Sequence, residues 1–506
     1  MVWRRGRTRR LPPFHADRGG QERAREQMAE ARIGQNALVT LVLQWTKYLV
    51  QVLSLIVLSH LLSPQDYGLV AMTLTIAGLA ALLGDLGLSL AALQAPTLSQ
   101  AQKSNLFWVN GALGVVVMAA VAGASVPLSL FYGQPAVVPI TLALSAVFAL
   151  NGFGVQLKVD VNRKGRFVAL GMIDLSGQVV GFVAAVAAAL AGAGYWALVV
   201  QQLTGSTVGL LVAALIARWR PSMPSRGSGI RPLLRFGRDT VGLNLMNYVT
   251  SNADSIVIGR MFGPSVLGLY NRAFQLVVLP LDQVLAPLTR VFLPRLTQLD
   301  DDERFHEALG RLQRVVVYGI LGPLSLLGVA AAPLLGVVLG QQWVGAAALV
   351  HVLVLGGVFQ ALEYVYYWAF LSRGRTRTLL LSELCGRVPM VALIIGLAPL
   401  GPIFVALAVA IGQALIWAVS TVWFAPRSGL RPRMLLQPTV RPVVLFAAAT
   451  AATALVQVFA APLPPLPLLL VLVGTWGTVA ALGVAASRTS RNDVQLIIGS
   501  IRRAPA

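Results

Sequence analysis

Long apolar runs recur along nearly the whole chain, at a length that suits a membrane. Windows of about 19 residues find roughly fourteen of them. A helix in lipid satisfies its own backbone hydrogen bonds, so the sequence predicts an all-α polytopic membrane protein with about 14 transmembrane helices. We place the spans near 37–62, 69–95, 106–125, 136–157, 167–190, 194–217, 239–263, 265–296, 315–340, 345–371, 378–399, 401–425, 442–461 and 464–486.

Composition supports a membrane protein and argues against nucleic-acid binding. The chain is 56% hydrophobic and 12% charged, whereas soluble domains are about a quarter charged. Its net charge of +21 comes from short basic clusters between apolar runs, as in cytoplasmic loops. Cys385 is the single cysteine, so neither a disulfide nor a cysteine metal site is expected, and we expect it to be a packed small residue.

Lysine and arginine collect in alternate loops. The opposite loops, among them "SVPLSLFYGQ", "GQQW" and "APLPPLP", carry none. Basic loops stay on the cytoplasmic side, so both termini are predicted to be cytoplasmic. The basic segments are the amino end, 158–166, 218–238, 373–377, 426–441 and the end of the chain from 487.

The chain repeats a short motif after about two hundred residues. Pro64 and Gly68 in "LLSPQDYGLV" recur as Pro264 and Gly268 in "MFGPSVLGLY", and 163–177 aligns with 372–386. This repeat predicts two parallel six-helix lobes around a central cavity, plus two C-terminal helices. The expected parts are an Arg-rich cytoplasmic tail (1–35), an N-lobe (36–217), a basic linker (218–238), a C-lobe (239–425), a cytoplasmic loop (426–441), the last two helices (442–486) and a cytoplasmic tail (487–506). Residues 1–35 are expected to be disordered, with an anionic-lipid contact as the alternative.

Matching polar stripes run along the first span of each half. Their spacing keeps each stripe on one helical face, which predicts a water-filled cavity between the lobes. Polar contacts between packed helices are the alternative, but they explain Lys47 poorly, because a lysine at mid-membrane costs about 2.5–3.5 kcal/mol. The stripes are Thr40, Gln44, Lys47, Gln51 and Ser54, and Thr240, Asn244, Asn247, Ser251 and Asp254.

Other charged and aromatic side chains lie within the spans. Arg272 and Arg290 are expected to face the cavity, and Asp85 favours a structural ion pair over an ion-coupling carboxylate. Asp174 and Glu383 are interpreted as salt bridges that tether basic loops. The acidic segment 299–308 reads as a solvated amphipathic linker. An interfacial belt, or alternatively sugar stacking, is predicted for Tyr364, Tyr367 and Trp368.

No catalytic constellation is evident, since the four histidines are scattered and no nucleotide-binding motif occurs in a suitable context. We therefore expect neither an enzyme nor a cofactor or metal.

Three stretches carry a family resemblance: "LLSPQDYGLV" (61–70), "LGDLGLSLAALQ" (83–94) and "DSIVIGRMFGPSVLGLY" (254–270). Over about residues 35–425 the chain resembles the bacterial oligosaccharide and polysaccharide flippases of the multidrug/oligosaccharidyl-lipid/polysaccharide exporter superfamily. The resemblance implies that an undecaprenyl-diphosphate-linked oligosaccharide crosses the inner membrane, from the cytoplasmic to the periplasmic leaflet, by alternating access. It also implies a biosynthetic partner such as a polysaccharide polymerase or export machinery.

The residues suit that substrate. Lys47 and the arginines can hold a diphosphate, the polar stripes can bond sugar hydroxyls, and the lipid tail can stay in the bilayer. A lipid II flippase remains an alternative. A multidrug exporter would call for more cavity carboxylates, and a glycosyltransferase or polymerase for a larger outer loop. The candidate binding residues are Gln44, Lys47, Gln51, Asn244, Asn247, Ser251, Asp254, Arg272 and Arg290.

Overall fold

The structure is a computed structural model that describes residues 18–85, 92–93, 95, 98–225 and 231–502. Side chains are described within these ranges except at 18–38, 41, 81–85, 231–247, 249 and 496–502. No strand occurs in the described part of the chain, so the all-α prediction is confirmed. Twelve described helical segments are long and apolar enough to cross a membrane. Counting the kinked helix α9 (Arg231–Thr297) twice, and adding α2 (Pro64–Asp85), gives the predicted count of about fourteen.

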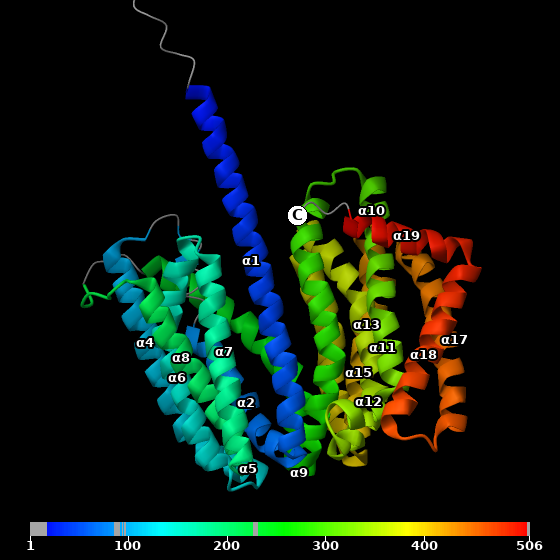
Figure 1. The fold of residues 1–506 in the computed structure, drawn as a ribbon, viewed down its shortest axis with the longest axis horizontal. Helices are drawn as coiled ribbons and strands as arrows, with labels where there is room; N and C mark the ends of the chain where they lie inside the picture. The colour runs from blue at the N-terminus through cyan, green and yellow to red at the C-terminus, as the bar shows by residue number, and fades with distance from the viewer. Residues whose placement is uncertain (1–17, 86–91, 94, 96–97, 226–230, 503–506) are drawn as a thin grey trace, which may run out of the picture.

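The first half of the chain forms one group of helices, on the left of Figure 1. Helices α7 and α8 pack closely together, as do α4 and α6, and α1 lies against α7. The elements are α1 (Arg18–Leu61), α2, α4 (Gln100–Gly123), α5 (Ser125–Tyr132), α6 (Val137–Arg163), α7 (Phe167–Leu190) and α8 (Trp196–Ala217).

The second half forms the other group, in which α17 and α18 lie at the outer edge (Figure 1). Its large buried core includes Tyr270, Trp343, Trp368 and Phe370. The elements after α9 are α10 (Asp302–Val316), η1 (Val317–Leu321), α11 (Gly322–Val329), α12 (Ala331–Val338), η2 (Gln341–Ala346), α13 (Ala347–Ser372), α14 (Thr376–Leu397), η3 (Ala398–Leu400), α15 (Pro402–Val419), η4 (Ser420–Phe424), α16 (Ala425–Arg427), α17 (Pro432–Ala460), α18 (Pro465–Ala486) and α19 (Arg488–Arg502).

The two repeated motifs pack against each other where the groups converge, at the bottom of Figure 1. A Cβ atom on Gly68 would lie 1.7 Å from the carbonyl oxygen of Pro264, and one on Gly268 would lie 1.9 Å from that of Pro64. Gly263, at φ 80°, makes the kink in α9 that brings Pro264 to this contact. Only glycine lets the two backbones approach so closely. We call this the corner end, and the opposite end, with the start of α1 and with α19, the tail end.

An indole and an amide from the second half reinforce the corner end. The Nε1 atom of Trp343 donates to the carbonyl oxygen of Ser59 at 2.8 Å. The Nε2 atom of Gln342 donates to the carbonyl oxygens of Ser59 and Leu62 at 2.5 and 3.0 Å. These bonds satisfy carbonyls at the end of α1 that have no partner within the helix.

Several segments expected to be irregular are helical at the tail end. Helix α1 begins at Arg18 rather than near 37, so the predicted disorder of 1–35 is wrong from Arg18 onward. The segment "QERAREQMAEARIGQ" (21–35) is rich in strong helix formers, which lets the span continue outward. In the same way α9 starts at Arg231 inside the expected linker, and α17 starts at Pro432 inside the expected loop 426–441.

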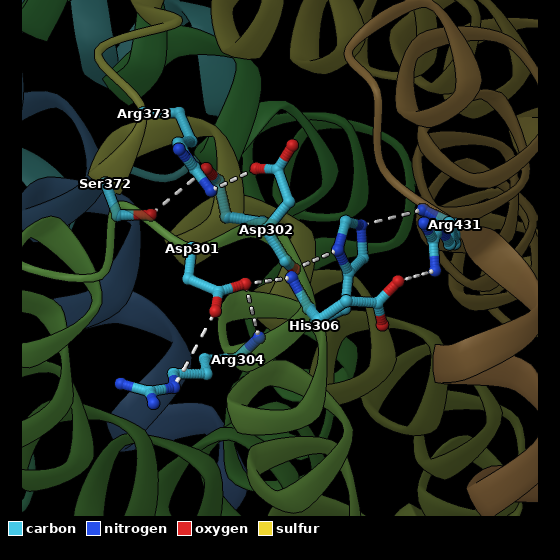
Figure 2. Close-up of polar contacts among 9 residues, drawn as sticks. Asp301, Asp302, Arg304, His306, Ser372, Arg373 and Arg431 are labelled. Atoms are coloured by element: carbon cyan, nitrogen blue, oxygen red, sulfur yellow. Dashed lines mark hydrogen bonds and ion pairs between the residues drawn. The ribbon is translucent and has the colours of Figure 1, made fainter.

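The acidic segment 299–308 is not a solvated linker, because α10 buries Phe305, Leu309 and Leu312. Polar contacts fix its start to two basic loops (Figure 2). Asp302 accepts from Arg373 at 2.7 Å, and Glu303 accepts from Arg431 at 2.7 Å. The prediction of a packed cysteine is also wrong, because Cys385 lies exposed on α14.

Candidate functional site

A cavity of about 810 Å³ lies among α1, α2, α6, α7, α8 and the part of α9 after its kink. Its wall is polar although these helices are apolar in composition. Seven of the lining residues are carboxamides, which both donate and accept hydrogen bonds. The polar lining residues are Gln51, Ser54, Asn151, Lys158, Asp174, Gln178, Gln201, Gln202, Ser206, Asn271, Arg272 and Gln275.

Glycines on α7 and α8 help to keep the cavity hollow. A Cβ atom on Gly177 would lie 2.6 Å from the carbonyl oxygen of Gly205, and one on Gly181 would lie 2.8 Å from that of Gln201. The two helices therefore meet backbone to backbone. These glycines also line the cavity without placing side chains in it.

A charged cluster lies on α1, α6 and α7. Its members Lys158 and Asp174 line the cavity, whereas Lys47 lies beside Asp174 and is not one of the lining residues. Lys158 Nζ lies 2.8 Å from one oxygen of Asp174, and Lys47 Nζ lies 3.6 Å from the other. All three side chains are about a third exposed, at 39%, 34% and 37% for Lys158, Asp174 and Lys47. The cluster holds two cations and one anion, so it carries net positive charge.

This cluster gives Lys47 a partner and corrects one expectation. The carboxylate beside Lys47 is Asp174, because α1 packs along α7. The structural ion pair expected for Asp85 stays a prediction, since the Asp85 side chain lies outside the described residues. The expectation that Asp174 tethers a loop is wrong. Lys158 was assigned to a loop from its basic surroundings, but α6 continues to Arg163 and carries Lys158 within it.

Arg272 lines the same cavity near the corner end. Its guanidinium carbon lies 3.8 Å from the centre of the Tyr67 ring and 5.6 Å from that of Trp343. Its Nη1 atom donates to Gln275 Oε1 at 2.6 Å. Only 8% of the residue is exposed, so this cation is held among aromatic rings and an amide.

Ser251 and Asp254, the described members of the α9 stripe, line a different and much smaller pocket, of about 110 Å³. Asp254 is buried and accepts from the hydroxyl of Tyr270 at 2.5 Å. Arg387 donates to Ser251 Oγ at 2.8 Å and pairs with Glu383 at 2.5 Å. The interpretation of Glu383 as a loop tether is therefore wrong, since its partner lies one turn away on the same helix.

The remaining candidates are scattered. Gln44 and Arg290 are exposed and line neither cavity. The side chains of Asn244 and Asn247 lie outside the described residues. Trp368 is neither interfacial nor free to stack on a sugar, because it is 0% exposed and its Nε1 donates to Thr289 Oγ1 at 2.8 Å. Tyr364 and Tyr367 pack on each other at 5.1 Å and line neither cavity.

Sequence reasoning missed most of the cavity wall. Asn151, Gln178, Gln201, Gln202 and Ser206 lie on α6 to α8, and none belongs to a stripe. Their amide and hydroxyl groups within apolar spans could have indicated the cavity, because a polar side chain in a span is costly unless it meets a polar neighbour or a cavity.

A polytopic helical bundle with a polar, cationic cavity lined by both halves is an architecture that membrane transport proteins use. The model of a family described as "Polysaccharide biosynthesis protein" matches residues 57–348. The chain belongs to the polysaccharide biosynthesis protein family.

Three curated relatives are similar to most of the chain. The lipopolysaccharide biosynthesis protein WzxC of Escherichia coli K12 is 27% identical over 60% of this chain and 63% of its own length. The teichuronic acid biosynthesis protein TuaB of Bacillus subtilis 168 is 25% identical over 58% and 61%. The succinoglycan biosynthesis transport protein ExoT of Rhizobium meliloti 1021 is 27% identical over 59% and 61%. The chain thus spans about three fifths of the length of these relatives.

Two solved structures share the fold. The lipid II flippase MurJ in an inward closed conformation superposes with a TM-score of 0.68 and 10% identity, over 89% of this chain and 99% of MurJ. An inward-facing multidrug resistance transporter of the MATE family gives a TM-score of 0.53 and 17% identity, over 79% and 99%. These values establish a shared architecture alone.

Proposed function

We propose that the protein is a flippase that moves an undecaprenyl-diphosphate-linked oligosaccharide, a surface polysaccharide precursor, from the cytoplasmic to the periplasmic leaflet of a bacterial inner membrane. The observation that carries this proposal is one cavity with a long carboxamide wall, whose lining residues Lys158 and Asp174 form a charged cluster with Lys47 beside them. Lysines suit a diphosphate, and carboxamides suit sugar hydroxyls. The relatives' names, which concern polysaccharide biosynthesis and transport, support the same substrate class.

In this proposal the tail end is cytoplasmic, with both termini on that side, and the corner end is periplasmic. The glycine contact closes the corner end, and the lobes part there during alternating access. The lipid tail stays in the bilayer, because apolar chains gain nothing from entering a polar cavity. A polysaccharide polymerase or export machinery would receive the product.

The cavity supports this reading over its rivals. A site for cationic drugs would need free carboxylates, whereas Asp174, the carboxylate that lines the cavity in the described part of the chain, is shared by two lysines. A glycosyltransferase or polymerase would need a free general base for the acceptor hydroxyl, and Asp174 is paired with two lysines. A lipid II flippase would use the same cavity chemistry, and identification of the lipid-linked glycan that accumulates in a deletion strain separates it from the proposed function.

The decisive variant is Lys47→Gln. Asp174 keeps Lys158 at 2.8 Å, so removing Lys47 leaves no orphaned buried charge, and expression and melting temperature should stay nearly unchanged. A lost charge-assisted hydrogen bond is worth about 1.5–3 kcal/mol, so export should fall about tenfold or more. Lys47→Arg should retain more activity.

Export is measured as surface exposure of a labelled lipid-linked oligosaccharide in proteoliposomes. Arg260→Gln is the matched control. Arg260, on α9, is exposed beside Phe131 of α5 and lines neither cavity. Normal export by Lys47→Gln, or loss of that variant from the membrane, removes Lys47 from the diphosphate site.

A further inference from the structure

Arg272 is a buried cation without an anion. No carboxylate among the described residues forms an ion pair with it, although it is only 8% exposed. Asp66, next to Tyr67 in sequence, is engaged elsewhere, since one of its oxygens accepts from Ser63 N and Oγ at 2.9 and 2.6 Å. Lys158, in contrast, meets Asp174 within the same cavity.

The guanidinium of Arg272 keeps most of its hydrogen-bonding capacity. An arginine side chain has five N–H donors in one plane. The Tyr67 ring covers one face of that plane, Nη1 donates to Gln275, and Nε has no partner in the described part of the structure. A planar fork of this kind matches a carboxylate, which can accept two parallel bonds.

The position of Arg272 separates it from the lysine cluster. Its neighbours Tyr67 and Trp343 belong to the corner end. Lys158 lies on the last turns of α6, which ends at Arg163 toward the tail end. The cavity therefore has a cationic group toward each end, and its carboxamides lie along the wall between them.

We propose that Arg272 forms a second anion subsite, which takes the carboxylate of an acidic sugar. The inference rests on the proposed function and adds a substrate class to it: the lysine cluster binds the diphosphate, and Arg272 binds an acid group further along the glycan. A buried cation is costly when unpaired, and an acidic substrate supplies the missing partner. The protein would thus carry acidic glycans in preference to neutral ones.

The test compares two probes of the same shape. Trigalacturonic acid carries three carboxylates, and its fully methyl-esterified form carries none. Calorimetric titration of the purified full chain in phosphatidylcholine nanodiscs should give an affinity at least tenfold higher for the acid. In Arg272→Gln the two affinities should agree within about twofold, whereas Arg260→Gln should keep the preference.

Inorganic diphosphate serves as a third probe and separates the two sites. Lys158→Gln should lose most of its diphosphate affinity and keep its preference for the acidic sugar, and Arg272→Gln should show the reverse. Equal binding of acid and ester by the unaltered chain overturns the inference, and so does an Arg272→Gln variant that keeps the preference. Failure of the unaltered chain to bind diphosphate counts instead against the proposed function.

A purely structural role for Arg272 is tested by melting temperature and by a conservative variant. If Arg272→Gln is not recovered folded, Arg272→Lys keeps the charge but loses the planar fork. Its preference for the acid should then drop to about threefold, and a full preference in Arg272→Lys overturns the inference.

Discussion

The two halves of the molecule repeat a helical plan but not a cavity. Five helices of the first half line a cavity of about 810 Å³ together with α9, whereas the corresponding pocket in the second half measures about 110 Å³. Gln51 and Ser251 hold matching places in the repeat and line these two different spaces. The helical scaffold is therefore repeated without the large cavity, which is lined mostly by the first half and completed by α9 of the second.

The two halves differ in cavity volume because different groups face the glycines of their helix pairs. On α7 and α8, Gly177 meets the backbone of Gly205, so no side chain enters between the helices. On the related pair α14 and α15, a Cβ atom on Gly412 would lie 2.3 Å from Met390 Cγ, and one on Gly386 would lie 2.1 Å from Ile416 Cγ1. There each glycine receives a large side chain. Small residues alone thus do not predict a cavity, because the partner residue decides whether the space is filled.

The largest effect is expected from filling the large cavity. Asn151→Trp places an indole in the space proposed for the glycan, and export should fall to about a tenth or less, because a loss of 1.4 kcal/mol in binding already costs tenfold. Leu142→Trp, on an exposed position of the same helix, is the control. Export is followed in proteoliposomes. Normal export by Asn151→Trp would break the comparison, because the larger cavity would then not be the route.

At the corner end the two halves should respond alike. Gly68→Ala and Gly268→Ala each place a methyl group within 2 Å of a carbonyl oxygen of the other half. Each should destabilise the protein by about 1–3 kcal/mol, measured as a lower melting temperature. Gly396→Ala is the control, since nothing lies within 4 Å of its Cβ position. A clear effect in only one of the two corner variants would contradict a reciprocal contact.

A smaller contrast is expected between matched amide replacements. Gln202→Leu removes a hydrogen-bonding group from the large cavity, and one such bond is worth about 1 kcal/mol, so export should fall about fivefold. Gln413→Leu changes the small pocket in the same way, and export should stay within about twofold of normal. Equal losses in the two variants would assign substrate contacts to the small pocket as well as to the large cavity.

The smallest effect is expected at the tail end. Arg431 and Glu303 form an ion pair whose side chains are 56% and 63% exposed (Figure 2). Such a pair contributes less than about 1 kcal/mol, so Arg431→Gln should barely change the melting temperature and should leave export intact. A loss of export here would move part of the transport mechanism to α10 and α17.

The sequence predicted what depends on periodicity and repetition. Span number, helical class and the paired motifs at 61–70 and 261–270 follow from apolar length and residue spacing, and the structure bears out the helical membrane fold. The cavity was predicted only in part. Gln51 and Ser54 stood out on one stripe, but Gln178 and Gln201 reach the cavity through the packing of α7 on α8. A stripe rule applied to single helices misses residues that neighbouring helices bring together.

The same limit explains the pairings that the sequence did not predict. Lys47 stood out on its stripe without a partner, and Asp174 meets it from a helix more than a hundred residues away. Glu383 was assigned to a loop tether and Trp368 to the interfacial belt because both lie near span ends. Glu383 instead pairs within its own helix, and Trp368 is fully buried. Position along a span gives depth in the membrane, but which neighbour a side chain meets depends on helix rotation.

The corner contact has the form of an isologous interface inside a single chain: residue 68 meets residue 264, and residue 268 meets residue 64. In a symmetric dimer such a patch pairs with its own copy, so every change in it acts twice. Here the two copies sit on one chain and can vary separately. A larger residue at one glycine would fit only if the backbone of the opposite motif moved away. We therefore expect substitutions at Gly68 and Gly268 to be correlated during evolution.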